Sequence, residues 1–195
     1  TPTASTDAAT KGYVDAAGGG ALSWVIKRVF VTSSTYDGNL GGISGADAKC
    51  ATSATNAGLG GTWKAIISDN NIYAGDRINY NWDALKNMQG GFIVANFPGA
   101  SSVSGYGIGQ LWGTNLIRAV RYNEYGIINS SNITWTGTKT GDGGMSNCTQ
   151  WTTSSGAVDG YYGLSTYTSI DWIGSNSNTS FTPCNNLNRL YCIEQ

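Results

Sequence analysis

Histidine is absent from the 195-residue chain, and charged residues make up only 12% of it. The missing imidazole removes the commonest general base, the usual base of a catalytic triad and the usual zinc ligand. The 11 basic and 12 acidic residues nearly balance, so there is no global basic field to hold nucleic acid or an anionic membrane surface. No apolar run approaches the ~18 residues that span a bilayer. We therefore expect neither nucleic-acid binding nor membrane insertion.

Motifs of common enzymes and cofactor sites are also missing. The chain has no G-x-S-x-G elbow, no P-loop and no zinc-protease or zinc-deaminase signature. The glycines of "GYGIGQLWG" do not have the dinucleotide-binding spacing. Asp76 with Asp83, or Asp159 with Asp171, could form a glycosidase carboxylate pair, but scattered acids produce such pairs by chance. We expect no cofactor and no enzymatic activity, with a carboxylate-based hydrolase as a distant alternative.

The cysteines are Cys50, Cys148, Cys184 and Cys192. An even count without a C-x-x-C pair argues against a zinc knuckle or a thioredoxin-like redox site. It predicts two disulfides in an exported protein, and the residues alone leave three pairings open. Glycine, serine, threonine and asparagine are abundant, as on many extracellular surfaces. We expect an extracellular location, secreted or on the surface of a cell or virion.

Residues 1–22 differ in composition from the rest of the chain. Ala9, Tyr13 and Ala16 follow a helical apolar spacing that ends at "GGG". A helix this short is not stable alone. We interpret residues 1–22 as a stalk, oligomerisation or docking segment, the alternative being a flexible linker stub, and residues 23–195 as the main domain.

Short strands and one central helix are expected in the main domain. Strand-like composition, rich in β-branched and aromatic residues, occurs at 24–36, 62–69, 91–97 and 115–123, with turn residues between. Residues 70–90 are expected to form a polar excursion dotted with aromatic residues. Short strands, many turns and one or two helices indicate an α+β or mostly β domain.

The helix is expected between a Ser44 cap and Gly58, with Asp47 as a short-acid version of the capping box. Within it, Ala46, Cys50, Ala54 and Ala57 fall on one face. Cys50 should therefore point into the core. Trp63, Trp135 and Trp151 are also interpreted as core residues.

The stretch "GGISGADAKCATSATNAGLGGTWKAIISD" resembles the first helix and following strand of the endostatin domain found at the end of certain collagens, and of bacterial exported domains with the same pattern. Trp135, Gly137, Cys148 and Trp151, and "LYCIE" around Cys192, extend the resemblance over about residues 27–195. It implies a C-type-lectin-like α+β fold with a twisted mixed or antiparallel sheet, one or two helices and long loops. It also implies nested disulfides, Cys50 with Cys192 and Cys148 with Cys184.

Several endostatin and lectin properties do not carry over. The zinc-binding histidines are missing, and the calcium-lectin motifs Glu-Pro-Asn, Gln-Pro-Asp and Trp-Asn-Asp do not occur. Arginines that bind heparin in endostatin are clustered, whereas those of this chain are scattered along the sequence, at positions 28, 77, 118, 121 and 189. We expect no bound metal and no heparin-like binding.

The N-terminal "STDAATKGYVDAA" resembles a segment common in phage tail fibres and related trimeric stalk proteins. There it lies between fibre modules. Small residues around Tyr13 would let chains approach a common axis. The resemblance implies self-association through residues 1–22, as a trimer or a filament.

The expected binding site is the loop between Cys148 and Cys184. Its stretch "AVDGYYGLSTYTSIDWIG" mixes aromatic rings and carboxylates with small residues. Tyrosines among small residues give large, rigid contact area together with a hydrogen-bonding hydroxyl. The candidate ligand-binding residues are Tyr161, Tyr162, Tyr167, Trp172, Asp159 and Asp171. Alternatively, rings such as Trp172 pack under the loop as its private core, and the 70–90 excursion, with Tyr73, Tyr80 and Trp82, is a second candidate surface.

The sequence therefore predicts a non-enzymatic adhesion or receptor-recognition module that binds a surface glycan or protein through residues 152–183. The alternative is a structural subunit of a self-assembling extracellular filament, docking through its N-terminal segment onto the neighbouring copy.

Overall fold

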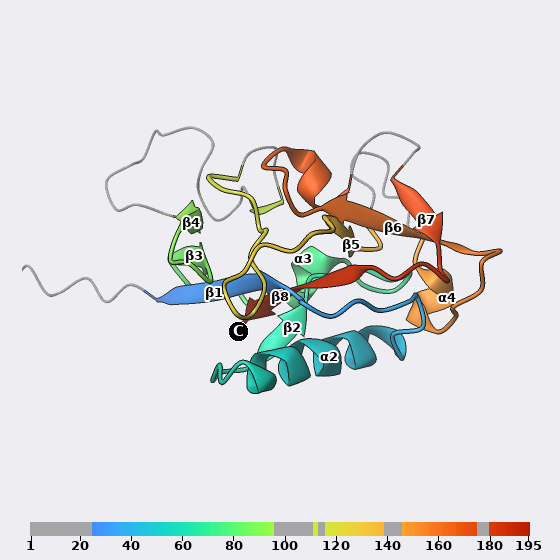
Figure 1. Cartoon of the computed structure of the whole chain (residues 1–195), viewed down its shortest axis with the longest axis horizontal. Coiled ribbons are helices and arrows are strands. Elements are labelled where there is room, and N and C mark those ends of the chain that lie inside the picture. Colours follow the sequence, from blue (N-terminus) through green and yellow to red (C-terminus); the bar gives the residue numbers. More distant parts are fainter. Residues whose placement is uncertain (1–24, 96–110, 113–115, 139–145, 175–179) are drawn as a thin grey trace, which may run out of the picture.

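Strands from opposite ends of the described chain lie side by side at the centre of one sheet (Figure 1). The computed structural model describes residues 25–95, 111–112, 116–138, 146–174 and 180–195. β1 (Ile26–Val31) pairs antiparallel with β8 (Arg189–Glu194). The main domain therefore closes only when its first and last strands meet.

The sheet is mixed and follows the order β4-β3-β1-β8-β5-β6-β7. β2 pairs with β8 off this path. β1–β3 and β5–β8 are parallel pairs, and the remaining pairs are antiparallel. The other strands are β2 (Trp63–Ala65), β3 (Ala84–Asn87), β4 (Phe92–Ala95), β5 (Ile133–Trp135), β6 (Asp159–Leu164) and β7 (Phe181–Pro183). The expected α+β class with a mixed sheet is confirmed.

Side chains alternate along β8 between two buried clusters. Tyr191 and Ile193 join a cluster with Trp172, whereas Leu190 and Cys192 join a second cluster with Trp135 and the disulfides. Because both faces of β8 are covered, five of its six residues, from Arg189 to Ile193, are buried.

The central helix, α2 (Gly42–Asn56), runs along one side of the sheet (Figure 1). Ala46, Cys50 and Ala54 are buried on its inner face, as the spacing predicts. The cap was predicted wrongly, because the helix begins after Gly41, which has a positive φ of 84° and makes no side-chain cap. Asp47 instead accepts a hydrogen bond from Ala65 N at 2.8 Å, so it joins α2 to β2.

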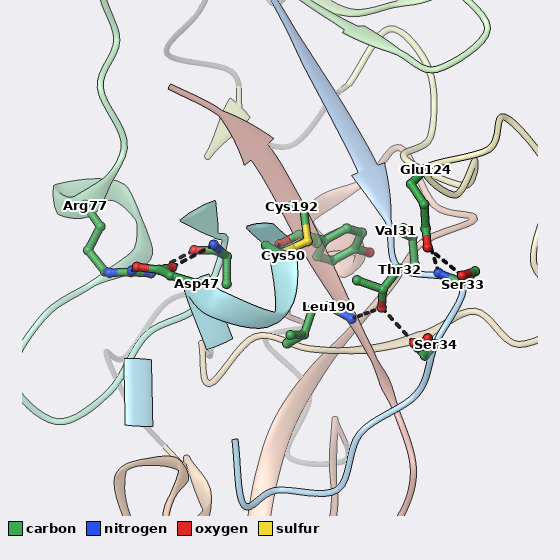
Figure 2. The surroundings of a disulfide bond; sticks show 12 residues. Val31, Thr32, Ser33, Ser34, Asp47, Cys50, Arg77, Glu124, Leu190 and Cys192 are labelled. Carbon is green, nitrogen blue, oxygen red and sulfur yellow. Dashed lines mark hydrogen bonds and ion pairs between the residues drawn. A yellow bond between two sulfur atoms is a disulfide. The ribbon is translucent and has the colours of Figure 1, made fainter. Parts of the chain in front are cut away.

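The nested pairing is confirmed. Cys50 binds Cys192, across a sequence separation of 142, and Cys148 binds Cys184, across 36. The outer bridge ties α2 to β8 (Figure 2), and both of its cysteines are fully buried. No free cysteine remains.

Three single turns complete the described structure: α3 (Ala74–Arg77), α4 (Cys148–Trp151) and the 3-10 turn η2 (Ile170–Trp172). In α4 all four residues have positive φ, from 49° to 64°, a left-handed conformation that costs roughly 1–2 kcal/mol per residue. Several contacts hold this turn. Among them, Asn147 Oδ1 accepts from Gln150 N at 2.9 Å, Trp151 Nε1 donates to Ser68 O at 2.8 Å, and Cys148 is bridged to Cys184.

Two strand predictions differ from the structure. Residues 62–69 contribute only Trp63–Ala65 to the sheet. Residues 116–123 form no strand, because they make isolated backbone hydrogen bonds to two different strands instead of a ladder with one. Ile117 N donates to Ile93 O of β4, and Tyr122 O accepts from Val31 N of β1. The 70–90 excursion contains α3 and β3.

The expected stalk or docking segment at 1–22 lies outside the described residues. Within the described part of the chain, no helix has the length and apolarity to cross a bilayer.

Candidate functional site

The predicted binding region is built around a hairpin next to an edge of the sheet. β6 lies between β5 and β7, and β7 is the outermost strand (Figure 1). Cys184, immediately after β7, is bridged to Cys148. The hairpin is therefore covalently anchored to α4, although residues 175–179 of the predicted loop lie outside the described structure.

Two aromatic side chains form a pair on this hairpin. Tyr161 is the register partner of Phe181, so both project from the same face of the sheet. Their ring centroids are 6.5 Å apart at an interplanar angle of 72°, an edge-to-face arrangement. Phe181 is 45% exposed and Tyr161 is half-buried. The anchored hairpin thus presents an aromatic surface at the edge of the sheet.

η2 packs closely against β6 because Gly163 has no side chain. A Cβ at Gly163 would lie 2.0 Å from Trp172 O. The Trp172 ring points into the core, fully buried, with its centroid 5.3 Å from that of Tyr191. Tyr191 Oη also donates to Trp172 O at 2.8 Å. Trp172 therefore packs beneath the loop, as the alternative interpretation has it, and offers no surface to a ligand.

The remaining predicted residues take different positions. Tyr167 is 45% exposed, in the turn between β6 and η2. Tyr162 and Asp159 are half-buried within β6. Asp171 is half-buried and accepts a hydrogen bond from Ser169 Oγ at 2.9 Å, which fixes the start of η2. Of the six candidates, Tyr161 and Tyr167 are those best placed to touch a partner.

The second predicted surface is largely internal. Trp82 is 4% exposed and donates from Nε1 to Asn79 O. Tyr80 Oη donates to Gly75 O at 2.8 Å and accepts from Trp112 Nε1. Burial raises the pKa of Tyr80 despite the opposing hydrogen bond from Trp112. The Tyr80 hydroxyl therefore stays protonated at neutral pH and links Trp112 to Gly75 of α3. Of the three aromatic residues predicted for this surface, only Tyr73 is exposed.

A hollow of about 200 Å³ joins the two predicted surfaces. Tyr73 and Gly75 come from the 70–90 excursion, and Ile173 follows η2. Its other lining residues are Ser68, Ala74, Trp112 and Thr138. Ser68 Oγ and Thr138 Oγ1 lie 2.7 Å apart at its polar end. Residues that the sequence separates into two candidate surfaces thus border one small, mainly apolar space.

Sequence reasoning missed Phe181 and Trp112. Phe181 lies in a stretch whose composition predicts a polar loop. The one signal that could have found it is its position three residues before Cys184, which the disulfide anchors. Trp112 gave no periodic signal, because it occurs in the glycine-rich stretch 105–113.

Among the described residues, no three Asp, Glu or Cys side chains gather in a way that could hold a metal ion. No curated protein matches the chain significantly. Residues 33–83, which contain α2, β2 and α3, are similar to a family described as "Protein of unknown function (DUF1554)".

Proposed function

We propose that the chain is an exported, non-enzymatic binding module with a C-type-lectin-like, endostatin-like fold, and that it recognises a glycan or a protein through residues 152–183. The mixed sheet, the single long helix and the nested disulfides support the fold assignment. Two disulfides also favour a location outside the cytosol, because cytosolic thiols are kept reduced.

The observation that carries this proposal is the exposed aromatic surface on an anchored hairpin. Phe181 and Tyr167 each expose 45% of their surface, and the edge-to-face contact with Tyr161 restricts the orientation of the Phe181 ring. Large rings that are already fixed lose little entropy on binding, and they can stack on a sugar ring or fill a pocket in a protein. The Cys148–Cys184 bridge supplies the rigid support.

A glycan array and a cell-surface binding screen test the proposal with the full chain. Phe181→Ala and Tyr167→Ala should each weaken binding by tenfold or more if these rings are anchors. Tyr125→Ala is the matched control, because Tyr125 is 55% exposed and lies outside residues 152–183. Binding that survives both loop substitutions would overturn the site, and a chain that binds neither glycans nor cell surfaces would overturn the function.

A further inference from the structure

A second concave surface lies at the opposite edge of the sheet from β7. There the turn between β3 and β4 and the segment 116–122 enclose a groove of about 550 Å³. This volume falls within the ~300–1,000 Å³ range of small-molecule sites. The lining residues include Asn87, Gln89 and Gly90 on one side and Arg118, Arg121 and Tyr122 on the other.

The walls of the groove are held in place by hydrogen bonds to the rest of the fold. Asn87 Oδ1 accepts from the backbone nitrogens of Gln89, at 3.0 Å, and Gly91, at 2.9 Å, which fixes the turn. Gln89 Nε2 donates to Gly126 O at 2.7 Å. The opposite wall is attached at both ends, through Ile117 N to Ile93 O and Val31 N to Tyr122 O. The groove is therefore preformed.

Both arginines of the groove lack an acidic partner in the described structure. The ion pairs found there use Arg28 and Arg77, and no Asp or Glu lines the groove. Arg121 lies over the Tyr122 ring, 5.5 Å from its centroid. Arg118 lies across Gly91, where an added Cβ would be 3.0 Å from Arg118 Cδ. Two exposed guanidinium groups are thus held at the groove with no carboxylate from the described residues beside them.

We propose that this groove binds a carboxylate-bearing sugar, such as a uronic acid residue within an oligosaccharide. Guanidinium groups bind a carboxylate through two parallel hydrogen bonds, while side-chain amides and turn backbone groups suit the hydroxyls of a sugar ring. The net charge of −1 argues against a long polyanion such as nucleic acid. This site is independent of the proposed surface on residues 152–183, because it lies at the other edge of the sheet.

Calorimetric titration of the full chain with trigalacturonate tests the proposal, with the fully methyl-esterified trisaccharide as the uncharged match. Arg118→Gln and Arg121→Gln should each weaken trigalacturonate binding about tenfold or more. Gly91→Ala keeps both charges but displaces Arg118, so it should also weaken binding. Lys49→Gln removes one charge from α2, far along the sequence from the groove, and should leave the affinity unchanged. Thermal melts check that every variant is folded.

Several results would overturn the proposal. One is that trigalacturonate does not bind at millimolar concentration. The others are that the methyl ester binds equally well, or that both arginine variants keep the wild-type affinity. Inorganic phosphate or tri-glutamate binding as tightly as trigalacturonate would replace the sugar with a general anion site or a peptide site. Phe181→Ala should leave trigalacturonate binding intact. A failure of the groove proposal can therefore be distinguished from a failure of the function proposed for residues 152–183.

Discussion

Arg28 on β1 and Glu194 on β8 are joined by two parallel hydrogen bonds, from Nε to Oε2 and from Nη2 to Oε1, each 2.8 Å long. Burial opposes ionisation of Glu194, but the hydrogen bonds and charge of Arg28, with the charge of Lys27, outweigh it and hold the pKa of this carboxyl below its ordinary value. A lowered folded-state pKa means that the pair stabilises the fold above the ordinary pKa of a glutamate. That contribution disappears as the pH falls through the lowered value.

Glu194→Gln should therefore destabilise the protein by about 1 kcal/mol at pH 7, a small value because Arg28 remains partly exposed. The difference between variant and wild type should shrink as the pH falls below about 4. Urea denaturation at several pH values measures both effects. A difference that stays constant between pH 7 and pH 3 would contradict the linkage.

The two disulfides should have different effects when removed. The outer bridge closes a loop of 142 residues and the inner one a loop of 36, worth roughly 5 and 4 kcal/mol in the chain-entropy model. Cys50→Ala with Cys192→Ala should lower the stability of the whole domain. Cys148→Ala with Cys184→Ala should in addition make residues 152–183 the first site of protease cleavage. Limited proteolysis and urea denaturation test this, and early cleavage elsewhere in the inner variant would contradict it.

Gly163→Ala should cost more than about 2 kcal/mol of stability, because its Cβ would meet the backbone carbonyl of Trp172 rather than a movable side chain. Gly60→Ala is the matched control, since nothing lies within 4 Å of its added Cβ. Its effect should stay within about 0.5 kcal/mol. Equal stability of the two variants in denaturant would show that η2 moves freely away from β6.

The left-handed turn predicts an unusual stabilising substitution. Thr149 is exposed and β-branched at φ 54°, where only glycine is unstrained. Thr149→Gly should raise the stability by up to about 1 kcal/mol. Thr52→Gly makes the same chemical change on the exposed face of α2. There it should lower the stability by about 0.3 kcal/mol, because glycine is the poorer helix former. Thermal melts compare the two, and the same sign for both would contradict the prediction.

Removal of residues 1–22 should leave the head folded with an unchanged Tm, because the truncated chain keeps the whole of β1 and its pairing with β3 and β8. Light scattering of the full chain should show a closed trimer or a monomer if the protein is a binding tip. Open-ended polymers that disappear on truncation would favour the filament alternative. A truncated chain that unfolds would mean that the segment belongs to the head.

How far the sequence predicts this structure depends on where the signal lies. Cys50 has a clear helical phase, and burial follows from it, whereas its partner came only from a family resemblance. Trp172 shows the opposite case, because nothing local distinguishes a ring above a loop from one beneath it. Its burial depends on tertiary packing, in which the backbone of Trp172 lies directly against Gly163. The start of α2 was missed because Asp47, the expected cap partner, is used by β2 and Arg77 instead. The arginine groove was missed for a related reason. Arg118 and Arg121 read as scattered charges until β3 and β4 are brought beside them.

The central position of β8 sets a limit on when the domain can fold. This strand follows the other seven along the chain, yet it pairs with β1, β2 and β5 and carries one half of the outer disulfide. Contacts across such sequence distances make folding slow. As the ribosome releases the chain, the earlier strands have no completed sheet to join. The polypeptide should therefore stay unfolded until β8 emerges, and the outer disulfide can lock the sheet only after that point.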